Sequence, residues 1–255
     1  MPRPTSRTLF VVVPGASQSP SHYGYLLHLL QSKGYPTLSA LLPSTGSSEN
    51  VTAYDDTEYV LKRMLLPILD VEKHNVILVT HSYSGIPGSA AAMGLSKAER
   101  TAQGKPTSVL GQIFISALLV AGGDGKDVVV ALGGHPPPHI GDHAGLLTCD
   151  DPAPPLYQDV APKLVQDAVV MSTMCPSFAS FHSPCPKASW SSEHYKGRIA
   201  YIRTVKDVGI PLEVQNIVLK GTDVEWIEKD IDTGHSPQIV QPETLLDIFI
   251  DLAEQ

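Results

Sequence analysis

The sequence predicts an α/β fold in which a mostly parallel β-sheet carries helices on both faces and one further segment is inserted as a cap. Apolar runs at residues 8–13 and 76–79 contain no polar alternation, which is typical of strands buried on both faces. Segments with the i, i+3, i+4, i+7 apolar spacing of amphipathic helices alternate with such runs, as at 21–33. Regular alternation of strands and helices favours a parallel sheet.

The strands share a composition of β-branched and other apolar residues, and each ends at polar or turn-forming residues. In chain order they are expected at 8–13, 37–42, 76–79, 108–118, 198–205 and 223–228. Pro14-Gly15 follows the first of them, and Pro43 follows the second. Because Pro lacks the amide hydrogen that a central strand donates, both positions mark strand ends.

The helices are longer and mix apolar with polar residues, and they are expected at 21–33, 54–69, 86–98, 210–219 and 242–253. Gly34 follows the first helix, where a residue with positive φ is often required. Pro67 lies near the end of the second helix, which its ring tends to terminate. The third helix is rich in Ala and other small residues, so it can pack closely against a strand.

Residues 124–197 break this alternation. They hold ten of the 22 prolines, five of the ten histidines and all three cysteines, with little periodicity apart from a helix-like stretch at 157–174. A long irregular stretch within one domain is typical of a functional lid or insertion. We therefore expect a core made of 1–123 and 198–255, and a cap made of 124–197 over the carboxyl edge of the sheet.

Composition limits the functions that the chain can have. Eighteen basic and 26 acidic residues give a net charge of −8 over 255 residues, which argues against nucleic acid and anionic membranes as partners. No apolar run approaches 20 residues, and residues 1–13 do not resemble a signal peptide, so we expect a cytoplasmic protein. We expect a small-molecule substrate, no cofactor and no metal; whether the chain is a monomer or a homodimer stays open.

The segment 80–85, with the sequence Thr-His-Ser-Tyr-Ser-Gly, follows a buried strand and precedes a helix. A strand, a tight turn with Ser at its tip, and a helix make up the context of a nucleophile elbow. Thr80 and Ser84 occupy the positions where the G-x-S-x-G motif has Gly. Taken alone, Ser82 fits a helix N-cap as well as a nucleophile.

A nucleophilic Ser needs a His that accepts its proton and a carboxylate that orients the His. Asp207 follows the strand expected at 198–205, and His235 lies between the strand expected at 223–228 and the last helix. The order Ser82, Asp207, His235 is the order that such sites have on parallel sheets. We therefore predict that these three residues form a catalytic triad.

The negative charge that develops on a carbonyl oxygen during acyl transfer needs backbone N–H donors. Tyr83 follows the predicted nucleophile and supplies one N–H group. The loop after the first strand supplies a second, which we assign to Ala16, because Gly15 allows that loop to turn towards the elbow.

These stretches resemble the α/β-hydrolase superfamily, specifically its small single-domain branch of plant methylesterases, hydroxynitrile lyases and fungal hydrolases of secondary-metabolite type. The matching stretches are 11–16, 42–46, 79–85, 201–207 and 234–237. The chain departs from the family pattern at Pro14, where His is usual, and at Thr80 and Ser84. The resemblance implies the α/β-hydrolase fold, Ser82 as nucleophile, Asp207 as acid, His235 as base, and Ala16 with Tyr83 as oxyanion hole.

Other features admit different readings. Asp124 is the rival triad acid, because some relatives place the carboxylate after that earlier strand. His135, His139 and His143 recur every fourth residue, but Pro136-Pro137-Pro138 prevents a regular helix that would gather them for a metal. Cys175 and Cys185 are more simply reduced thiols than a disulfide. His22 and Tyr23 either line the pocket or pack a helix start.

The leading functional hypothesis is a serine hydrolase that cleaves a small ester or lactone through an acyl-enzyme. The alternative is a lyase, cyclase or dehydratase that uses the same cleft with His235 as general base. Hydroxynitrile lyase is disfavoured, because in that branch Lys follows the His and here Ser236 does. A binding protein or receptor that keeps an inactive triad is a third class.

Overall fold

The computed structural model describes residues 8–47, 50–134, 141–149 and 151–254. Its main sheet has six strands in the order β2–β1–β3–β4–β7–β8, and every neighbouring pair is parallel. These strands are β1 (Thr8–Val13), β2 (Thr37–Ser39), β3 (Asn75–His81), β4 (Val109–Ile115), β7 (Ile199–Thr204) and β8 (Ile227–Ile231). The predicted parallel sheet is confirmed.

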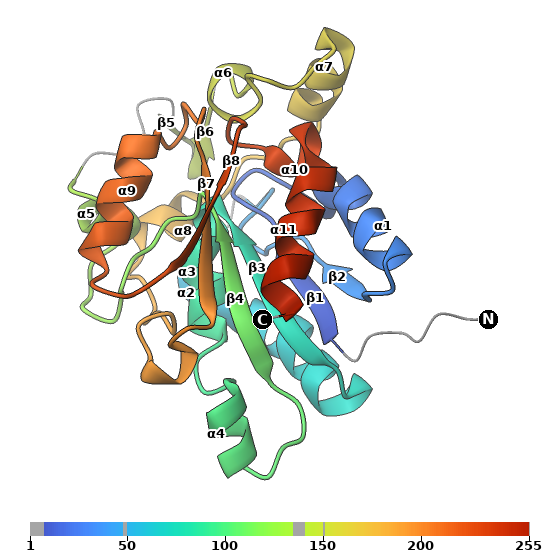
Figure 1. Ribbon diagram of the computed structural model, residues 1–255. Coiled ribbons are helices and arrows are strands. Elements are labelled where there is room, and N and C mark those ends of the chain that lie inside the picture. The colour runs from blue at the N-terminus through green and yellow to red at the C-terminus, as the bar shows by residue number, and fades with distance from the viewer. Residues whose placement is uncertain (1–7, 48–49, 135–140, 150, 255) are drawn as a thin grey trace.

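The helices cover both faces of this sheet, as predicted (Figure 1). In chain order, the α-helices of the described residues are α1 (Gly24–Ser32), α2 (Ala53–Tyr59), α3 (Gly85–Ala91), α4 (Lys97–Ala102), α5 (Val128–Ala131), α6 (Ala153–Leu156), α7 (Lys163–Met171), α8 (Phe178–His182), α9 (Leu212–Gly221), α10 (Pro237–Val240) and α11 (Pro242–Glu254). Helices α1 and α11 lie on one face, and α2 and α3 lie on the other.

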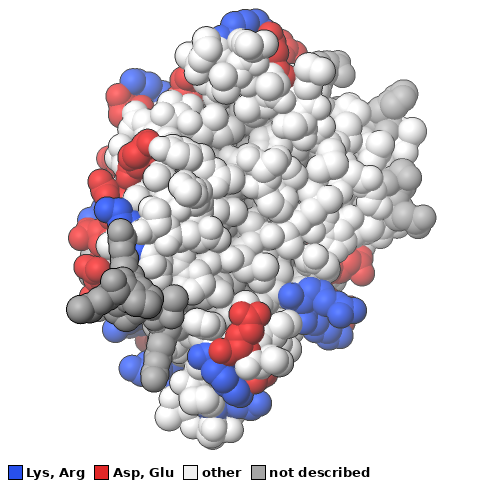
Figure 2. Space-filling model, turned by 90° about the vertical axis from the view of Figure 1, so that its right-hand side faces the viewer, with Lys and Arg blue, Asp and Glu red and all other residues white. Residues whose placement is uncertain are grey.

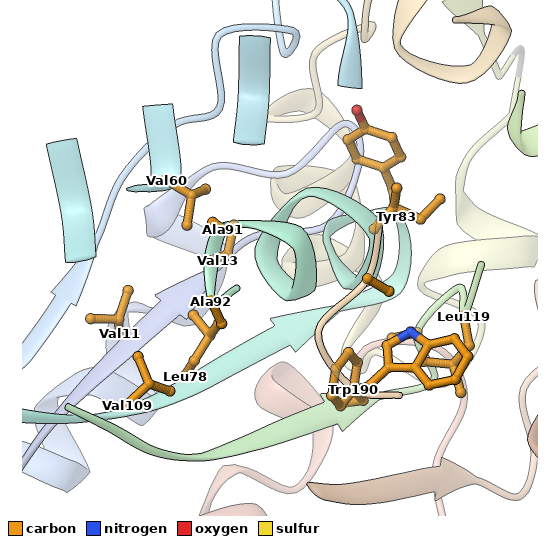
Figure 3. Packing of buried hydrophobic residues seen from close by; sticks show 14 of the residues in the cluster. Val11, Val13, Val60, Leu78, Tyr83, Ala91, Ala92, Val109, Leu119 and Trp190 are labelled. Carbon is orange, nitrogen blue, oxygen red and sulfur yellow. The ribbon is translucent and has the colours of Figure 1, made fainter. Parts of the chain in front are cut away.

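Alternate side chains of β1 enter two separate cores, which explains its unbroken apolar run. Val11 and Val13 join the cluster beneath α2 and α3, which Figure 3 shows from close by. Phe10 and Val12 point to the opposite face and join the cluster beneath α1 and α11. Burial of such a side chain stabilises the fold by roughly 1.5–3 kcal/mol relative to its exposure.

The helix predicted at 54–69 is divided. Its first part is α2, and two π-helical segments, Val60–Leu65 and Pro67–Glu72, continue the chain. Pro67 has no amide hydrogen and its ring displaces the preceding turn, so regular α-helical bonding does not pass through it. The helix predicted at 86–98 is also shorter, because α3 ends at Ala91 and Gly94 has a φ of +77°.

The strand predicted at 223–228 is placed too early, since β8 spans Ile227–Ile231. Trp226, which lies within the predicted strand, precedes β8. Its apolar ring packs edge-on against Phe114 at 5.3 Å and Tyr201 at 6.1 Å, so it serves the core and does not mark a strand. β8 lies at the edge of the sheet, and its exposed positions carry charged residues, although a charged residue also occupies one of its three more buried positions. The criterion of a wholly apolar strand does not apply at an edge.

Residues 124–197, predicted as a cap, lie between β4 and β7 in the chain. They contain α5 to α8 and a hairpin of β5 (Gly141–His143) and β6 (Leu146–Thr148), which was not expected. Helices α6 and α7 lie beyond the carboxyl ends of the strands (Figure 1). Of the helix-like stretch at 157–174, only α7 forms a regular helix. His135 and His139 lie outside the described residues.

Figure 2 shows one face of the molecule, on which charged side chains lie mostly towards the edges around an uncharged area. Surface charges pair locally, for example Lys206 with Asp232 at 2.7 Å and Lys229 with Asp251 at 3.0 Å. Exposed pairs contribute about 0–1 kcal/mol each, so the fold depends mainly on its apolar core. Within the described ranges, no helix is both long and apolar enough to cross a membrane.

Candidate active site

Ser82 lies in a strained turn at the carboxyl end of β3. Its φ is +54°, a left-handed value that costs a non-Gly residue free energy, and a single 3₁₀ turn (Ser82–Ser84) leads from it into α3. The amide of Leu118 donates a hydrogen bond of 2.9 Å to the carbonyl of Ser82 and so fixes the turn. This geometry fits the predicted nucleophile elbow.

The two departures from the Gly motif are accommodated by neighbouring residues. A Cβ atom added at Gly88 would lie 2.4 Å from Cγ2 of Thr80, so the absence of a side chain on α3 makes room for Thr80. The Ser84 hydroxyl accepts a hydrogen bond from the His81 amide at 2.9 Å and donates to the Val13 carbonyl at 2.8 Å. Ser84 therefore joins the ends of β1 and β3, a contact that Gly would not make.

His235 and Asp207 are in direct contact. Nδ1 of His235 lies 2.7 Å from Oδ2 of Asp207, and the two residues are 3% and 4% exposed. The other donors to the carboxylate are the Thr204 hydroxyl and the Ile210 amide, both at 2.8 Å. The amide side chain of Gln215 donates in turn to Thr204, which holds this support in place.

The electrostatic setting of Asp207 favours its ionised form. Burial raises the pKa of Asp207, but the charge of His235 and hydrogen bonds from His235, Ile210 and Thr204 outweigh burial. The pKa of Asp207 therefore lies below its ordinary value. A carboxylate held in this way keeps the proton of His235 on Nδ1 and leaves Nε2 available as a base.

Ser82 and His235 line the same pocket, which has a volume of about 80 Å³. Ala16 also lines it, and the role of its N–H group as an oxyanion donor stays a prediction. The remaining wall is largely apolar, with Leu118 and Ile210 from the core and Leu147, Leu156 and Phe181 from residues 124–197. An apolar pocket with a few converging polar groups is the usual form of a small-molecule site.

The loop after β1, which contains the predicted oxyanion donor Ala16, lies close to Ser82. A Cβ atom at Gly15 would lie 3.0 Å from Nδ1 of His81 and 3.2 Å from Cβ of Ser82, so only Gly fits there without displacement. Gly15 thus brings Ala16 to the pocket by close approach rather than by a positive φ. The Tyr83 side chain points away from the pocket: its ring stacks on Phe181 at 4.9 Å and its hydroxyl donates to Asp56 at 2.9 Å. Only its backbone N–H remains a candidate donor.

The competing candidates lie elsewhere. The Asp124 side chain is 51% exposed and pairs with Lys126 at 3.1 Å, whereas Asp207 contacts His235. Cys149, Cys175 and Cys185 form no disulfide in the described chain. No group of three or more His, Cys, Asp or Glu side chains suited to a metal ion gathers among the residues that the structure describes. His22 and Tyr23 are buried near the loop after β1, where the Gly15 amide donates to the Tyr23 hydroxyl, and neither lines the pocket.

Sequence reasoning did not connect a group of buried polar side chains at the pocket, of which Gln18 and His81 line it. The side chains of His81, Gln18 and Tyr23 are buried, and the Tyr23 hydroxyl lies within hydrogen-bond distance of both His81 Nδ1 and Gln18 Oε1, although 63 residues of chain separate Gln18 from His81. The signals in the sequence were the His directly before Ser82, at the end of a mostly apolar strand, and Tyr23, which was considered only as a pocket or helix-packing residue.

Comparisons with known proteins agree with this architecture. A family model described as "Alpha/beta hydrolase family" matches residues 10–248. A protein of Aspergillus novofumigatus named "Alpha/beta hydrolase nvfD" is 24% identical over 245 residues, covering 92% of each chain.

Solved structures with similar folds include a pyrethroid hydrolase from Sphingobium faniae, with a TM-score of 0.71, 21% identity and coverage of 97% of this chain and 98% of that one. A polyneuridine aldehyde esterase superposes with a TM-score of 0.72 at 18% identity and covers 98% of this chain and all of its own. At these identities the likeness to the solved structures concerns the fold.

Proposed function

The chain belongs to the alpha/beta hydrolase family, and from that premise we propose that it is a serine hydrolase that cleaves a small ester or lactone. The observation that carries the proposal is that Ser82 and His235 line one pocket while Asp207 holds the His235 ring. The strained φ of Ser82 supports the same assignment, because elbows hold their nucleophile in this conformation.

In the first half of the proposed reaction, the Ser82 hydroxyl attacks the ester carbonyl and transfers its proton to Nε2 of His235. Asp207 stabilises the resulting imidazolium. The backbone N–H groups of Ala16 and Tyr83 stabilise the oxyanion. When the tetrahedral intermediate collapses, the bond to the alcohol breaks, His235 gives its proton to the leaving oxygen, and Ser82 remains acylated.

In the second half, water attacks the acyl-enzyme, and His235 accepts one of its protons. Collapse of the second tetrahedral intermediate releases the carboxylic acid and returns the proton to Ser82. The buried setting of His235 and Asp207 supports both halves, because charge–dipole interactions are stronger where water is excluded.

The lining of the pocket supports an apolar acyl group. Leu118, Leu147, Leu156, Phe181 and Ile210 line the pocket that Ser82 and His235 share. The apolar side chains around it favour an unbranched hydrocarbon or a small ring over a charged group. The names of two structural neighbours, a pyrethroid hydrolase and a polyneuridine aldehyde esterase, support hydrolysis as a reaction that this framework carries.

A fluorophosphonate probe tests the proposal, because it reacts covalently with an activated Ser. We expect the wild type to be labelled at Ser82, and Ser82→Ala to lose both labelling and turnover of p-nitrophenyl acetate. Ser84→Gly is the matched control and is still labelled, since the Ser84 hydroxyl is engaged with backbone groups. The expected loss of turnover is on the order of 10⁶-fold for Ser82→Ala and similar for His235→Ala, because the pair acts as a unit.

The same variants separate hydrolysis from a lyase or cyclase reaction. A non-hydrolytic enzyme needs His235 to move a proton but needs no acyl bond to Ser82. A wild type that leaves simple esters intact and resists the probe would contradict the hydrolase.

A further inference from the structure

We propose that His81, Tyr23 and Gln18 form a positioning network that fixes the His235 loop and the Gly15–Ala16 loop relative to Ser82. The inference rests on the proposed function in that His235 is taken as the base. Gln18 and His81 also line the pocket, whereas Tyr23 does not; the role proposed here for all three is to hold the loops that carry Ser82, His235 and Ala16.

His81 is the centre of the network. It directly precedes Ser82, and its side chain is fully buried. Nε2 of His81 lies 2.8 Å from the backbone carbonyl of His235. Because a carbonyl only accepts hydrogen bonds, Nε2 carries the proton and Nδ1 of the neutral ring is an acceptor. The residue before the nucleophile thus holds the backbone of the base.

Tyr23 satisfies the other ring nitrogen. Its hydroxyl lies 2.7 Å from Nδ1 of His81 and is also in hydrogen-bond contact with Oε1 of Gln18, so one phenol proton faces two acceptors. The same hydroxyl accepts a hydrogen bond from the amide of Gly15 at 3.2 Å. Tyr23 therefore connects the loop after β1 to His81 through a single oxygen atom.

Gln18 extends the network to the far side of the base. Its Nε2 lies 3.5 Å from the Ser236 hydroxyl, at the outer limit of a hydrogen bond. The Ser236 hydroxyl itself donates to the carbonyl of Leu156 at 2.8 Å. The network thus joins three carboxyl-end loops: the loop after β1, the elbow after β3 and the loop after β8.

His81 stays neutral while His235 acquires charge. Burial, followed by the nearby His235, lowers the pKa of His81 to about 3. The two rings lie 4.7 Å apart between centroids, and Asp207, Tyr23, Gln18 and His22 are the other polar groups near His81. A cation on His81 would oppose the imidazolium that forms on His235 in the transition state. A neutral donor fixes the base without that penalty.

Removal of one hydroxyl tests the network. We expect Tyr23→Phe to lower kcat on p-nitrophenyl acetate about 10- to 100-fold, because a displacement of the order of 1 Å costs up to about 100-fold. KM stays nearly unchanged, since the pocket wall is intact, and the rate of fluorophosphonate labelling falls by the same factor as kcat. His81→Gln, which keeps an N–H donor for the His235 carbonyl, retains more activity than His81→Leu.

Tyr195→Phe is the matched control. Tyr195 is also buried, and its hydroxyl donates to the carbonyl of Ala92 at 2.8 Å, remote from the pocket. Both Tyr→Phe variants lower the melting temperature, but only Tyr23→Phe changes kcat. If the two variants lose stability alike and both keep the kcat and the labelling rate of the wild type, Tyr23 is merely structural and the inference is wrong.

Nuclear magnetic resonance distinguishes this failure from a failure of the proposed function. Long-range ¹H–¹⁵N spectra of the wild type should show His81 as the neutral Nε2–H tautomer at pH 5, and Tyr23→Phe should shift the ring signals of His235. If simple esters are not hydrolysed but the His235 signals move in Tyr23→Phe, the network stands and the hydrolase assignment falls. Unmoved His235 signals overturn the network whether or not esters are hydrolysed.

Discussion

The pocket has two walls of different construction. The core wall, made of Ala16, Ser82 and His235 with their neighbours, is held by buried hydrogen bonds that connect loops from distant parts of the chain. The opposite wall comes from residues 124–197 and presents apolar side chains such as Leu156 and Phe181. The first wall contains the groups that are proposed to transfer protons, and the second determines the shape of the pocket.

Substitutions in the two walls should therefore have different effects on the reaction. A displaced proton acceptor loses catalysis by orders of magnitude, whereas a change of one methylene in an apolar wall alters selectivity by roughly 10- to 200-fold. Changes in the core wall should therefore lower the reaction rate on every substrate. Changes in the other wall should redistribute rates among substrates.

The largest effect within the core wall should come from Asp207→Asn. We expect kcat to fall about 10⁴-fold with the fold intact, because Asn leaves the His235 ring in the wrong tautomer. Steady-state kinetics on p-nitrophenyl acetate measures this loss. Asp124→Asn, at the exposed ion pair with Lys126, should leave kcat unchanged. If Asp124→Asn lowers kcat and Asp207→Asn does not, the triad acid is Asp124, which follows β4.

The buried His81 should make the core wall sensitive to acid. Its folded-state pKa of about 3 lies below the ordinary 6.5, so the unfolded chain binds the proton more tightly. The contribution of His81 to stability is complete above pH 6.5 and is lost as the pH falls towards 3, at about 1.4 kcal/mol per pH unit. Urea denaturation at several pH values should show a shallower slope for His81→Gln, while the exposed His28→Gln keeps the wild-type slope.

The packing beneath the elbow should couple two positions eight residues apart. Gly88→Ala should destabilise the fold by about 1–3 kcal/mol, because its Cβ would meet Cγ2 of Thr80. Thr80→Ser removes that methyl group and keeps the hydroxyl, so the double variant should recover much of the loss. Denaturation of the four proteins gives the coupling energy, and additive effects would show that the two sites do not compete for space.

The smallest effect on overall rate should come from the apolar wall. Leu156→Ala enlarges the pocket, so the ratio of kcat/KM for p-nitrophenyl butyrate to that for the acetate should rise about 10-fold. Leu164→Ala on the exposed face of α7, where the side chain is 79% exposed, is the control and should leave the ratio unchanged. Equal losses on both esters would mean that this wall contributes to the chemistry.

The sequence allowed the sheet and the predicted triad positions to be located because both depend on local patterns. Asp207 follows the mostly apolar β7, and the misplaced boundary of β8 did not affect His235, which lies beyond either version of that strand. Gly88 makes room for the Thr80 side chain because of the way α3 packs against β3. No local sequence pattern encodes that packing. The hairpin β5–β6 lacks a sequence signal because its partners, Pro176 and Ser177, are distant in the chain.

The β4–β7 connection has one more consequence, for how this protein can evolve. Its two ends run side by side: the Gly123 amide donates to the Cys185 carbonyl, and the Ala188 amide donates to the Ala121 carbonyl, both at 2.9 Å. Between them Gly122, with φ of +63°, has no room for a Cβ atom, which would lie 2.0 Å from the Pro186 carbonyl oxygen. A connection whose two ends are held together can change its length with little loss of stability, since each doubling of the loop length costs only about 0.6 kcal/mol. Lineages can therefore exchange the residues between 124 and 184 while the sheet and the predicted triad positions stay as they are.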